Sequence, residues 1–320
     1  MNNDNKLRIA LCQMAPVWLS KKPTMQKIES FINDAGKQQC DLIVFGEGLL
    51  PGYPFWVEHT NGAKFESDFQ KEMYAHYLEQ SVNIQGGDLE SVCELASSNK
   101  IAIVLGVIER AMDRGGHSVY CSLVYITKEG KIANVHRKLM PTYEERLVWC
   151  TGDGHGLKTF PVKNFTMGAL NCWENWMPLA RTSLYGQGEN LHIALWPGSV
   201  RNTEDLTRFI ARESRSFVVS VSGLMNKENI PENIPFSKEL KEKMPEVSAD
   251  GGSCVAGPDG KWVLEPVVGK EGLFITEIDI KSVFKERNNF DPTGHYSRPD
   301  VLQLQLNSKR LGSIDEFNAV

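Results

Sequence analysis

The sequence predicts an α/β protein whose β-sheets are covered by helices. Apolar runs typical of strands recur along the chain, at 7–12, 41–46, 101–107, 119–126, 131–137, 165–171, 191–196, 217–222 and 272–279. Segments with a helical pattern alternate with many of these runs, at 22–38, 66–80, 88–98, 174–186 and 204–216. Strands and helices that alternate in this way are typical of the α/β class.

The predicted elements follow one another without a break that would mark a hinge. Helix 22–38, for example, leads directly into strand 41–46. The stretch 226–250 is rich in Lys, Glu, Asn and Pro, which predicts a surface insertion between two strands. Toward the C-terminus the pattern becomes irregular and polar, which predicts a tail at about 291–320 that wraps a neighbour or stays mobile. Because no linker is evident, we expect a single domain over residues 1–320.

The composition favours a globular protein that acts on small molecules. The chain has 320 residues, of which 41% are hydrophobic, so it can bury a sizeable core. A net charge of −5 leaves no broad basic surface, which argues against nucleic acid or an anionic membrane as a partner. No apolar run approaches transmembrane length, and the polar N-terminus lacks the apolar core of a secretory signal.

The seven cysteines form an odd, scattered set, and several lie in or beside apolar strand patterns. This distribution predicts reduced thiols and a cytoplasmic location.

One of these cysteines, Cys172, ends a β-rich run just before a helix-like segment. The amide N–H groups of a starting helix lower the pKa of a nearby thiol, favour the reactive thiolate and can stabilise an oxyanion. The alternative is that Cys172 is a small buried hydrophobe, as most free cysteines are.

Two further polar residues follow apolar strands in the same manner. Glu47 comes after the run 41–46, and Lys138 comes after the run that ends at Arg137. The carboxyl ends of strands converge on the usual active site of an α/β fold, so Glu47, Lys138 and Cys172 are candidates for one site. In such a site the carboxylate takes the thiol proton, the thiolate attacks an electrophilic carbon and the lysine stabilises the developing anion. Taken singly, an acidic residue at a strand end is more often a cap or a solvated loop residue.

Patterns for metal or cofactor binding are weak. The histidines show no pair at the short spacing of a zinc site, and the cysteines form no Cys-x-x-Cys pair. The glycine-rich stretch 152–156 lacks the lysine and the serine or threonine of a phosphate-binding loop. We therefore expect neither a metal nor a cofactor.

Three segments resemble motifs of the nitrilase superfamily of carbon–nitrogen hydrolases, and they occur in the family's order. They are 45–54 around Glu47, 136–142 around Lys138, and 171–175 around Cys172. The resemblance implies a four-layer α-β-β-α sandwich, with Glu47 as general base, Lys138 as acid and oxyanion stabiliser, and Cys172 as nucleophile. It also implies a second glutamate that orients Lys138. Alignment on the following arginine selects Glu145, with Glu144 as the competing assignment.

Other segments are similar to the true nitrilase branch, namely 146–154, 173–181 and 291–300. This likeness implies hydrolysis of a nitrile to the carboxylic acid and ammonia through a thioimidate and a thioester, without a cofactor. It also implies a homo-oligomer, either a dimer or a spiral of dimers. The alternatives are an amidase that uses the same residues, a relative that hydrates nitriles or cyanide and stops at the amide, and a catalytically silent scaffold.

The sequence departs from the family at two positions and leaves the pocket open. Gly46 stands where relatives commonly carry proline and is expected to loosen the backbone before the base. Cys150 stands where they usually carry glycine, and is either a second thiol near the site or a structural cysteine. For the oxyanion and substrate pocket we expect Tyr53, Trp173 and Trp196, although a large aromatic residue is more often part of the core.

Overall fold

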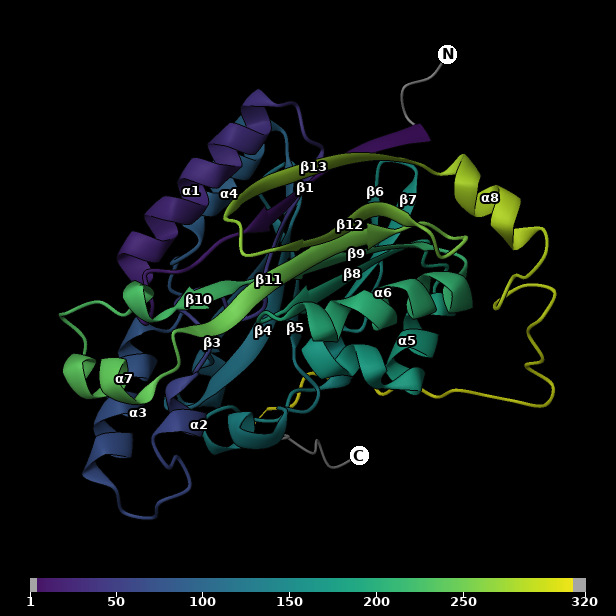
Figure 1. The fold of residues 1–320 in the computed structure, drawn as a ribbon. Coiled ribbons are helices and arrows are strands. Elements are labelled where there is room, and N and C mark those ends of the chain that lie inside the picture. The colour runs from purple at the N-terminus through teal and green to yellow at the C-terminus, as the bar shows by residue number, and fades with distance from the viewer. Residues whose placement is uncertain (1–4, 313–320) are drawn as a thin grey trace.

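The computed structural model describes residues 5–312, which form two β-sheets packed face to face with helices outside (Figure 1). The first sheet has the order β13-β1-β2-β3-β4-β5. Its strands are β1 (Lys6–Gln13), β2 (Leu42–Phe45), β3 (Ala102–Arg110), β4 (Val119–Ile126), β5 (Ile132–Arg137) and β13 (Gly272–Asp279). Strands β1, β2 and β3 are parallel, and the outer pairs are antiparallel.

The second sheet has the order β10-β11-β9-β8-β7-β6, with β12 paired to β11. Its strands are β6 (Phe160–Val162), β7 (Phe165–Asn171), β8 (Leu191–Trp196), β9 (Phe217–Ser222), β10 (Leu224–Asn226), β11 (Val247–Ala256) and β12 (Trp262–Val268). Its central strands β7, β8 and β9 are parallel. The predicted four-layer sandwich is therefore confirmed.

Helices α1 (Lys21–Lys37) and α4 (Glu90–Asn99) cover the outer face of the first sheet, and α5 (Pro178–Tyr185) and α6 (Val200–Ser214) cover that of the second. The other helices are α2 (Trp56–His59), α3 (Asp68–Gln80), α7 (Ser237–Lys243) and α8 (Lys281–Arg287). Short 3₁₀ helices lie at Met112–Arg114, Tyr143–Leu147, Gly154–Gly156, Cys172–Trp176 and Lys227–Asn229. Within residues 5–312, no helix combines the length and the apolar character that a membrane crossing requires.

An apolar layer lies on each face of the central strand β2. Alternate residues of β2, such as Leu42 and Val44, pack between the sheets, where β8 and β9 meet them. The other residues of β2, Ile43 and Phe45, pack outward against α1 and α4. Buried on both faces, β2 is a continuous apolar run, as is typical of parallel strands in an α/β protein.

The predicted surface insertion at 226–250 does lie between two strands, β10 and β11, and most of its residues are exposed or half-buried. It also contains α7, and four of its apolar residues are buried in a cluster with Trp18 and Trp56. Those residues are Ile230, Ile234, Leu240 and Met244. They form two pairs at a spacing of four residues with a polar, proline-containing stretch between them, which is too short for a sustained periodic signal, so the tertiary structure shows their burial.

The chain beyond α8 has no helix or strand in its described part, 288–312. Near its end the Arg310 guanidinium donates to the Val135 carbonyl at 2.6 Å and binds the Asp153 carboxylate at 3.1 Å. The tail thus returns to its own chain beside β5. The remainder of the predicted domain and tail, 1–4 and 313–320, lies outside the described residues.

Candidate active site

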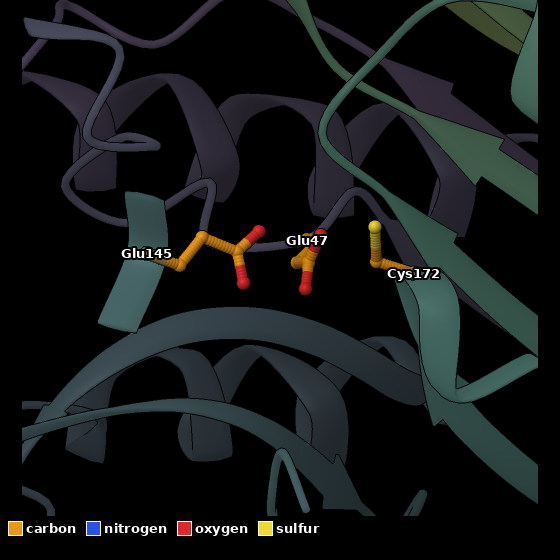
Figure 2. Close-up of side chains that lie close together, drawn as sticks. All are labelled: Glu47, Glu145 and Cys172. Atoms are coloured by element: carbon orange, nitrogen blue, oxygen red, sulfur yellow. The ribbon is translucent and has the colours of Figure 1, made fainter. Parts of the chain in front are cut away.

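The three polar residues that follow apolar strands meet at one place, between the two sheets. Glu47 follows β2, Lys138 follows β5 of the same sheet, and Cys172 follows β7 of the opposite sheet. Their side chains are almost wholly buried, with residue exposures of 2%, 1% and 4%. Figure 2 shows Glu47 between Glu145 and Cys172.

Lys138 links the two carboxylates. Its Nζ lies 2.8 Å from Glu47 Oε1 and 2.7 Å from Glu145 Oε2. The Tyr53 hydroxyl donates to the other oxygen of Glu145 at 2.6 Å. An oxygen of each glutamate and Sγ of Cys172 all lie within 4.8 Å of one another. The result is a compact set of a thiol, an ammonium and two carboxylates.

The structure also separates the two adjacent glutamates that the sequence leaves open. Glu145 points inward to Lys138, whereas Glu144 is half-buried on the cavity wall. A capping box at the 3₁₀ helix Tyr143–Leu147 holds Glu145 in place, and the Thr142 amide donates to Glu145 Oε2 at 2.6 Å. This local turn decides which carboxylate reaches the lysine.

Cys172 occupies an unusual backbone conformation. Its φ of 45° lies in the left-handed region, which is rare for a residue with a side chain and clusters at functional sites. Asn175 stabilises the turn by donating from Nδ2 to the Cys172 carbonyl at 2.8 Å. His192 links Asn175 Oδ1 to Glu189, at 2.7 Å and 2.9 Å, so a buried polar chain supports the turn.

A buried carboxylate that the sequence analysis missed connects the lysine segment with the cysteine segment. Glu174 accepts from the Asn171 amide at 2.8 Å, from the Leu139 amide at 2.7 Å and from His136 Nε2 at 3.0 Å. Burial alone would raise the pKa of Glu174, but His136 and these hydrogen bonds lower it, so the group is an anion. The signal was present in the sequence, because Asn171 and Glu174 have the spacing of a capping box.

Burial controls the proton affinities in the cluster. It raises the pKa of Glu47 to about 7, although the Lys138 ammonium opposes the rise. Burial by itself would lower the pKa of Lys138, but the surrounding Cys172, Glu47 and Glu145 raise it well above its ordinary value. Lys138 is therefore a cation, and Glu47 gains and loses a proton near neutral pH.

The predicted lowering of the cysteine pKa is wrong. Burial and the neighbouring Glu47 raise the pKa of Cys172 well above its usual range, and the Lys138 charge and the Trp173 amide offset this only in part. A five-residue 3₁₀ helix follows the cysteine in place of a long α-helix, so the field of aligned peptides is small. The burial of Cys172 thus favours the thiol over the thiolate.

A cavity of about 310 Å³ opens onto Cys172 and Glu145. Tyr53 and Trp173 lie on its wall, as expected. The Trp196 side chain does not: it is wholly buried and packs with Cys172 in the cluster beneath α6. The remaining wall residues are Phe55, Glu58, Thr142, Tyr143, Glu144, Pro197, Gly198, Ser199, Arg201, Asn202 and Ser248.

The two family departures have different consequences. Gly46 lies where the sheets approach closely, since a Cβ there would lie 2.9 Å from the Gly223 amide nitrogen and 3.1 Å from the Trp196 carbonyl. Glycine allows this close approach of the sheets, and the Glu47 amide donates to the same carbonyl at 3.1 Å. Cys150 is half-buried, and its amide donates to the Val119 carbonyl at 2.9 Å. It is absent from the described wall of the cavity.

Glu47, Glu145 and Cys172 are close enough for their donor atoms to surround a cation. Lys138 Nζ already binds an oxygen of each carboxylate, so the chain supplies the positive charge at this place. An added cation would have to lie beside that ammonium, and the electrostatic repulsion disfavours such a site.

Comparisons with known proteins agree with the fold and show the family. Residues 8–286 match the family model described as carbon-nitrogen hydrolase. "Nitrilase 2" of an unknown prokaryotic organism is 32% identical over 96% of this chain and 94% of its own. The "Aliphatic nitrilase" of Rhodococcus rhodochrous is 31% identical over 95% of this chain and 84% of its own.

A solved structure shows the same fold at much lower sequence identity. The carbon-nitrogen hydrolase from Helicobacter pylori G27 aligns with a TM-score of 0.69 at 19% identity, over 93% of this chain and 97% of its own. The family match spans both sheets and all the segments that meet at Cys172. The chain belongs to the carbon–nitrogen hydrolase family.

Proposed function

We propose that this protein is a nitrilase that hydrolyses an organic nitrile to the carboxylic acid and ammonia. One observation carries the proposal: the Cys172 thiol lies on the cavity wall beside Glu47, in a chain with 31–32% identity to nitrilases over nearly its whole length. Glu47, Lys138, Cys172 and Glu145 are the proposed catalytic machinery. Tyr53 and Trp173 are the proposed walls of the substrate site, where Trp196 has no part.

The first covalent stage begins with proton transfer from Cys172 to Glu47. The Sγ electron pair forms a bond to the nitrile carbon, and one π pair of the C≡N bond moves to nitrogen. Lys138 stabilises the developing charge on nitrogen and supplies a proton, which gives a covalent thioimidate. The pKa of about 7 at Glu47 suits a group that must accept a proton and later return it.

The second stage uses two molecules of water. Glu47 first passes the proton it received from Cys172 to Lys138, which gave its own proton to the nitrogen, so Glu47 is again a carboxylate and Lys138 an ammonium. Glu47 then takes a proton from the first water, whose oxygen adds to the thioimidate carbon, and returns that proton to the nitrogen. The hydroxyl proton of the tetrahedral intermediate moves through Glu47 to the same nitrogen, so ammonia leaves and a thioester remains. The second water attacks the resulting thioester in the same way, which releases the carboxylic acid and returns the proton to Cys172. Glu145 keeps Lys138 in position through both stages by means of its 2.7 Å contact.

The proposal includes a small substrate, because the cavity has a volume of about 310 Å³.

We also propose a single domain over 1–320, a cytoplasmic location and a homo-oligomer. Support for the oligomer comes from apolar side chains that are exposed together around α5 and α6. These side chains are Trp176, Met177, Leu179 and Phe209.

The test measures ammonia, acid and amide released from aliphatic, aromatic and arylaliphatic nitriles and from the matching amides. We expect acid from nitriles at a higher rate than from amides, and no turnover by Cys172→Ala. A Cys150→Ala variant is the matched control, since it removes a thiol outside the cavity wall. Turnover of amides alone would identify an amidase, release of the amide alone would identify a hydrating enzyme, and full activity of Cys172→Ala would overturn the mechanism.

A further inference from the structure

The two oxygens of the Glu47 carboxylate have different surroundings. Oε1 accepts from Lys138 Nζ at 2.8 Å and from the thiol of Cys121 at 3.4 Å. Oε2 is buried and has no hydrogen-bond partner among residues 5–312. The carboxylate therefore has one oxygen held on two sides and one oxygen left to accept a proton.

Cys121 is suited to act as a donor in this arrangement. It lies in β4 and is wholly buried, with 1% of its surface exposed. Burial and the neighbouring Glu47 raise the pKa of the Cys121 thiol well above its usual range, so the sulfur keeps its hydrogen. A protonated thiol is a weak hydrogen-bond donor, and a carboxylate is a strong acceptor.

The same residue is also tied to the lysine. The Lys138 amide donates to the Cys121 carbonyl at 2.8 Å. Cys121 thus contacts the proposed base through its side chain and the lysine segment through its backbone. The described strand pairing continues this link, because the next residue of β4, Ser122, pairs with Arg137 of β5.

We propose that Cys121 is a positioning residue for the hydrolysis, whose thiol holds Oε1 of Glu47 so that Oε2 remains the oxygen that takes the proton of Cys172. The inference rests on the proposed function, in which Glu47 is the base. The two oxygens of an ionised carboxylate are equivalent, so a half-turn would restore the same contacts, but any partial rotation would break the contacts to the held oxygen. The Cys121 thiol therefore adds to Lys138 a second anchor on the same oxygen.

Several titratable groups face Glu47 from the packed elements, and the thiol acts together with them. They are Lys138, Glu145, Cys172 and the phenols of Tyr53 and Tyr77. Among the effects on Glu47, burial raises its pKa, while Lys138 and the donated hydrogen of Cys121 lower it. Loss of the thiol should raise that pKa and shift the acidic limb of kcat/KM to higher pH.

The experiment compares Cys121→Ala, which removes the donor, with Cys121→Ser, which keeps a donor. The matched controls are Cys254→Ala and Cys254→Ser, because Cys254 is equally buried in a strand but donates at 3.6 Å to Thr207. For each protein, kcat/KM for a nitrile is measured from pH 5 to pH 9. In parallel, alkylation of Cys172 by iodoacetamide is followed across the same pH range by peptide mass spectrometry, which needs no substrate.

We expect Cys121→Ala to move the acidic limbs of both pH profiles, that of kcat/KM and that of Cys172 alkylation, to higher pH. At a fixed pH on either limb, the rate should be about three- to tenfold lower than in wild type. Cys121→Ser should lie close to wild type, and both Cys254 variants should keep the wild-type limb. Unshifted limbs in Cys121→Ala would overturn the proposal. So would an equal shift in Cys254→Ala, which would indicate a general effect of packing.

The two readouts also separate this inference from the proposed function. Suppose that the wild-type protein does not hydrolyse nitriles but that Cys121→Ala shifts the pH dependence of Cys172 alkylation. That result would refute the nitrilase function and support the positioning role of Cys121. If the wild-type protein hydrolyses nitriles but the pH dependence of Cys172 alkylation is the same in Cys121→Ala, the nitrilase function would be supported and the positioning role of Cys121 refuted. If Cys121→Ala does not fold, the pH profile of Cys121→Ser provides the test. Serine still donates a hydrogen bond, so loss of the acidic limb in this variant would contradict the positioning role of Cys121.

Discussion

Glu47 and Lys138 share a hydrogen bond in a place from which water is nearly excluded, and this burial sets their proton affinities. A carboxylate that is buried next to an ammonium is pulled in two directions, because desolvation favours the neutral acid and the cation favours the anion. At Glu47 desolvation dominates and raises the pKa to about 7. Cys172 experiences the same desolvation, which raises the pKa of its thiol, and in the proposed mechanism Glu47 accepts the thiol proton.

The first prediction concerns pH. Glu47 can accept the thiol proton only when it is ionised, so kcat/KM for the hydrolysed substrate should fall as pH decreases through about 7. An exposed glutamate would give a limb near its ordinary pKa of 4.5. A pH–rate profile from pH 4 to pH 9 measures the limb, and full activity at pH 5 would contradict the assignment.

The second prediction separates the two neighbouring glutamates. Glu145→Gln should lower kcat by about 10²-fold or more, because Lys138 loses a charged partner at 2.7 Å. Glu144→Gln, in the adjacent position on the cavity wall, should change KM at most. Steady-state kinetics of both variants provide the test. A larger loss of kcat in Glu144→Gln would reverse the assignment.

Short turns after strands determine whether these side chains reach one another. The 3₁₀ helix Cys172–Trp176 gives Cys172 a positive φ, and the 3₁₀ helix Tyr143–Leu147 directs Glu145 inward. Glu174 joins the first of these turns to the segment after β5 through three hydrogen bonds. The elements thus hold the thiol and the ammonium at a constant separation.

The third prediction tests this connection. Glu174→Ala leaves His136 and two amide groups buried without their acceptor, which should cost about 3–5 kcal/mol of unfolding free energy. Urea unfolding measures the loss, and Glu129→Ala on the exposed turn after β4 is the control, expected to unfold at the same urea concentration as wild type. Equal stability of the two variants would show that Glu174 has no structural role.

The fourth prediction tests the backbone conformation at Cys172. Glycine adopts a positive φ without the penalty of a Cβ, so Cys172→Gly should be more stable than Cys172→Ala by about 1 kcal/mol. Neither variant retains the nucleophile, so activity does not complicate the comparison. Thermal unfolding of both proteins gives the difference, and a more stable alanine variant would argue against strain at this position.

On the scale of the whole molecule, the two sheets bring together residues that are distant in the chain. β2 and β5 belong to one sheet and β7 to the other, so the site exists only when the sheets are packed. The exposed apolar residues around α5 and α6 lie on the outside of the second sheet. The Arg181 guanidinium, 5.8 Å from the ring of Phe209, joins the two helices there. A face of this kind is typical of a subunit interface.

The fifth prediction concerns that face. If it forms the oligomer contact, the double variant Leu179→Glu/Phe209→Glu should sediment and scatter light as a smaller species than wild type. Phe65→Glu is the matched control, because Phe65 is 88% exposed in the loop between α2 and α3 and belongs to neither α5 nor α6. A wild-type monomer, or an unchanged mass in the double variant, would refute the proposed interface.

The local pattern of apolar residues was sufficient to predict many of the strands. Strands such as β4 and β8 are wholly buried and therefore carry an unbroken apolar signal. β11 and β12 were missed, since β11 contains Gly251 and Gly252 at positive φ and β12 contains Pro266. Glycine and proline weaken a strand pattern, while pairing with β9 supplies the order that the local sequence lacks.

The sequence by itself determined the fold class and the chemical types at the site, because residues after apolar strands can be identified from periodicity and from their resemblance to a family. Only the tertiary structure decided the proton affinities, the choice of Glu145, the burial of Trp196 and the contact between Cys121 and Glu47. The physical reason is that pKa values and hydrogen bonds depend on desolvation and on distances across the two sheets. Neither quantity is encoded in the spacing of residues along one strand.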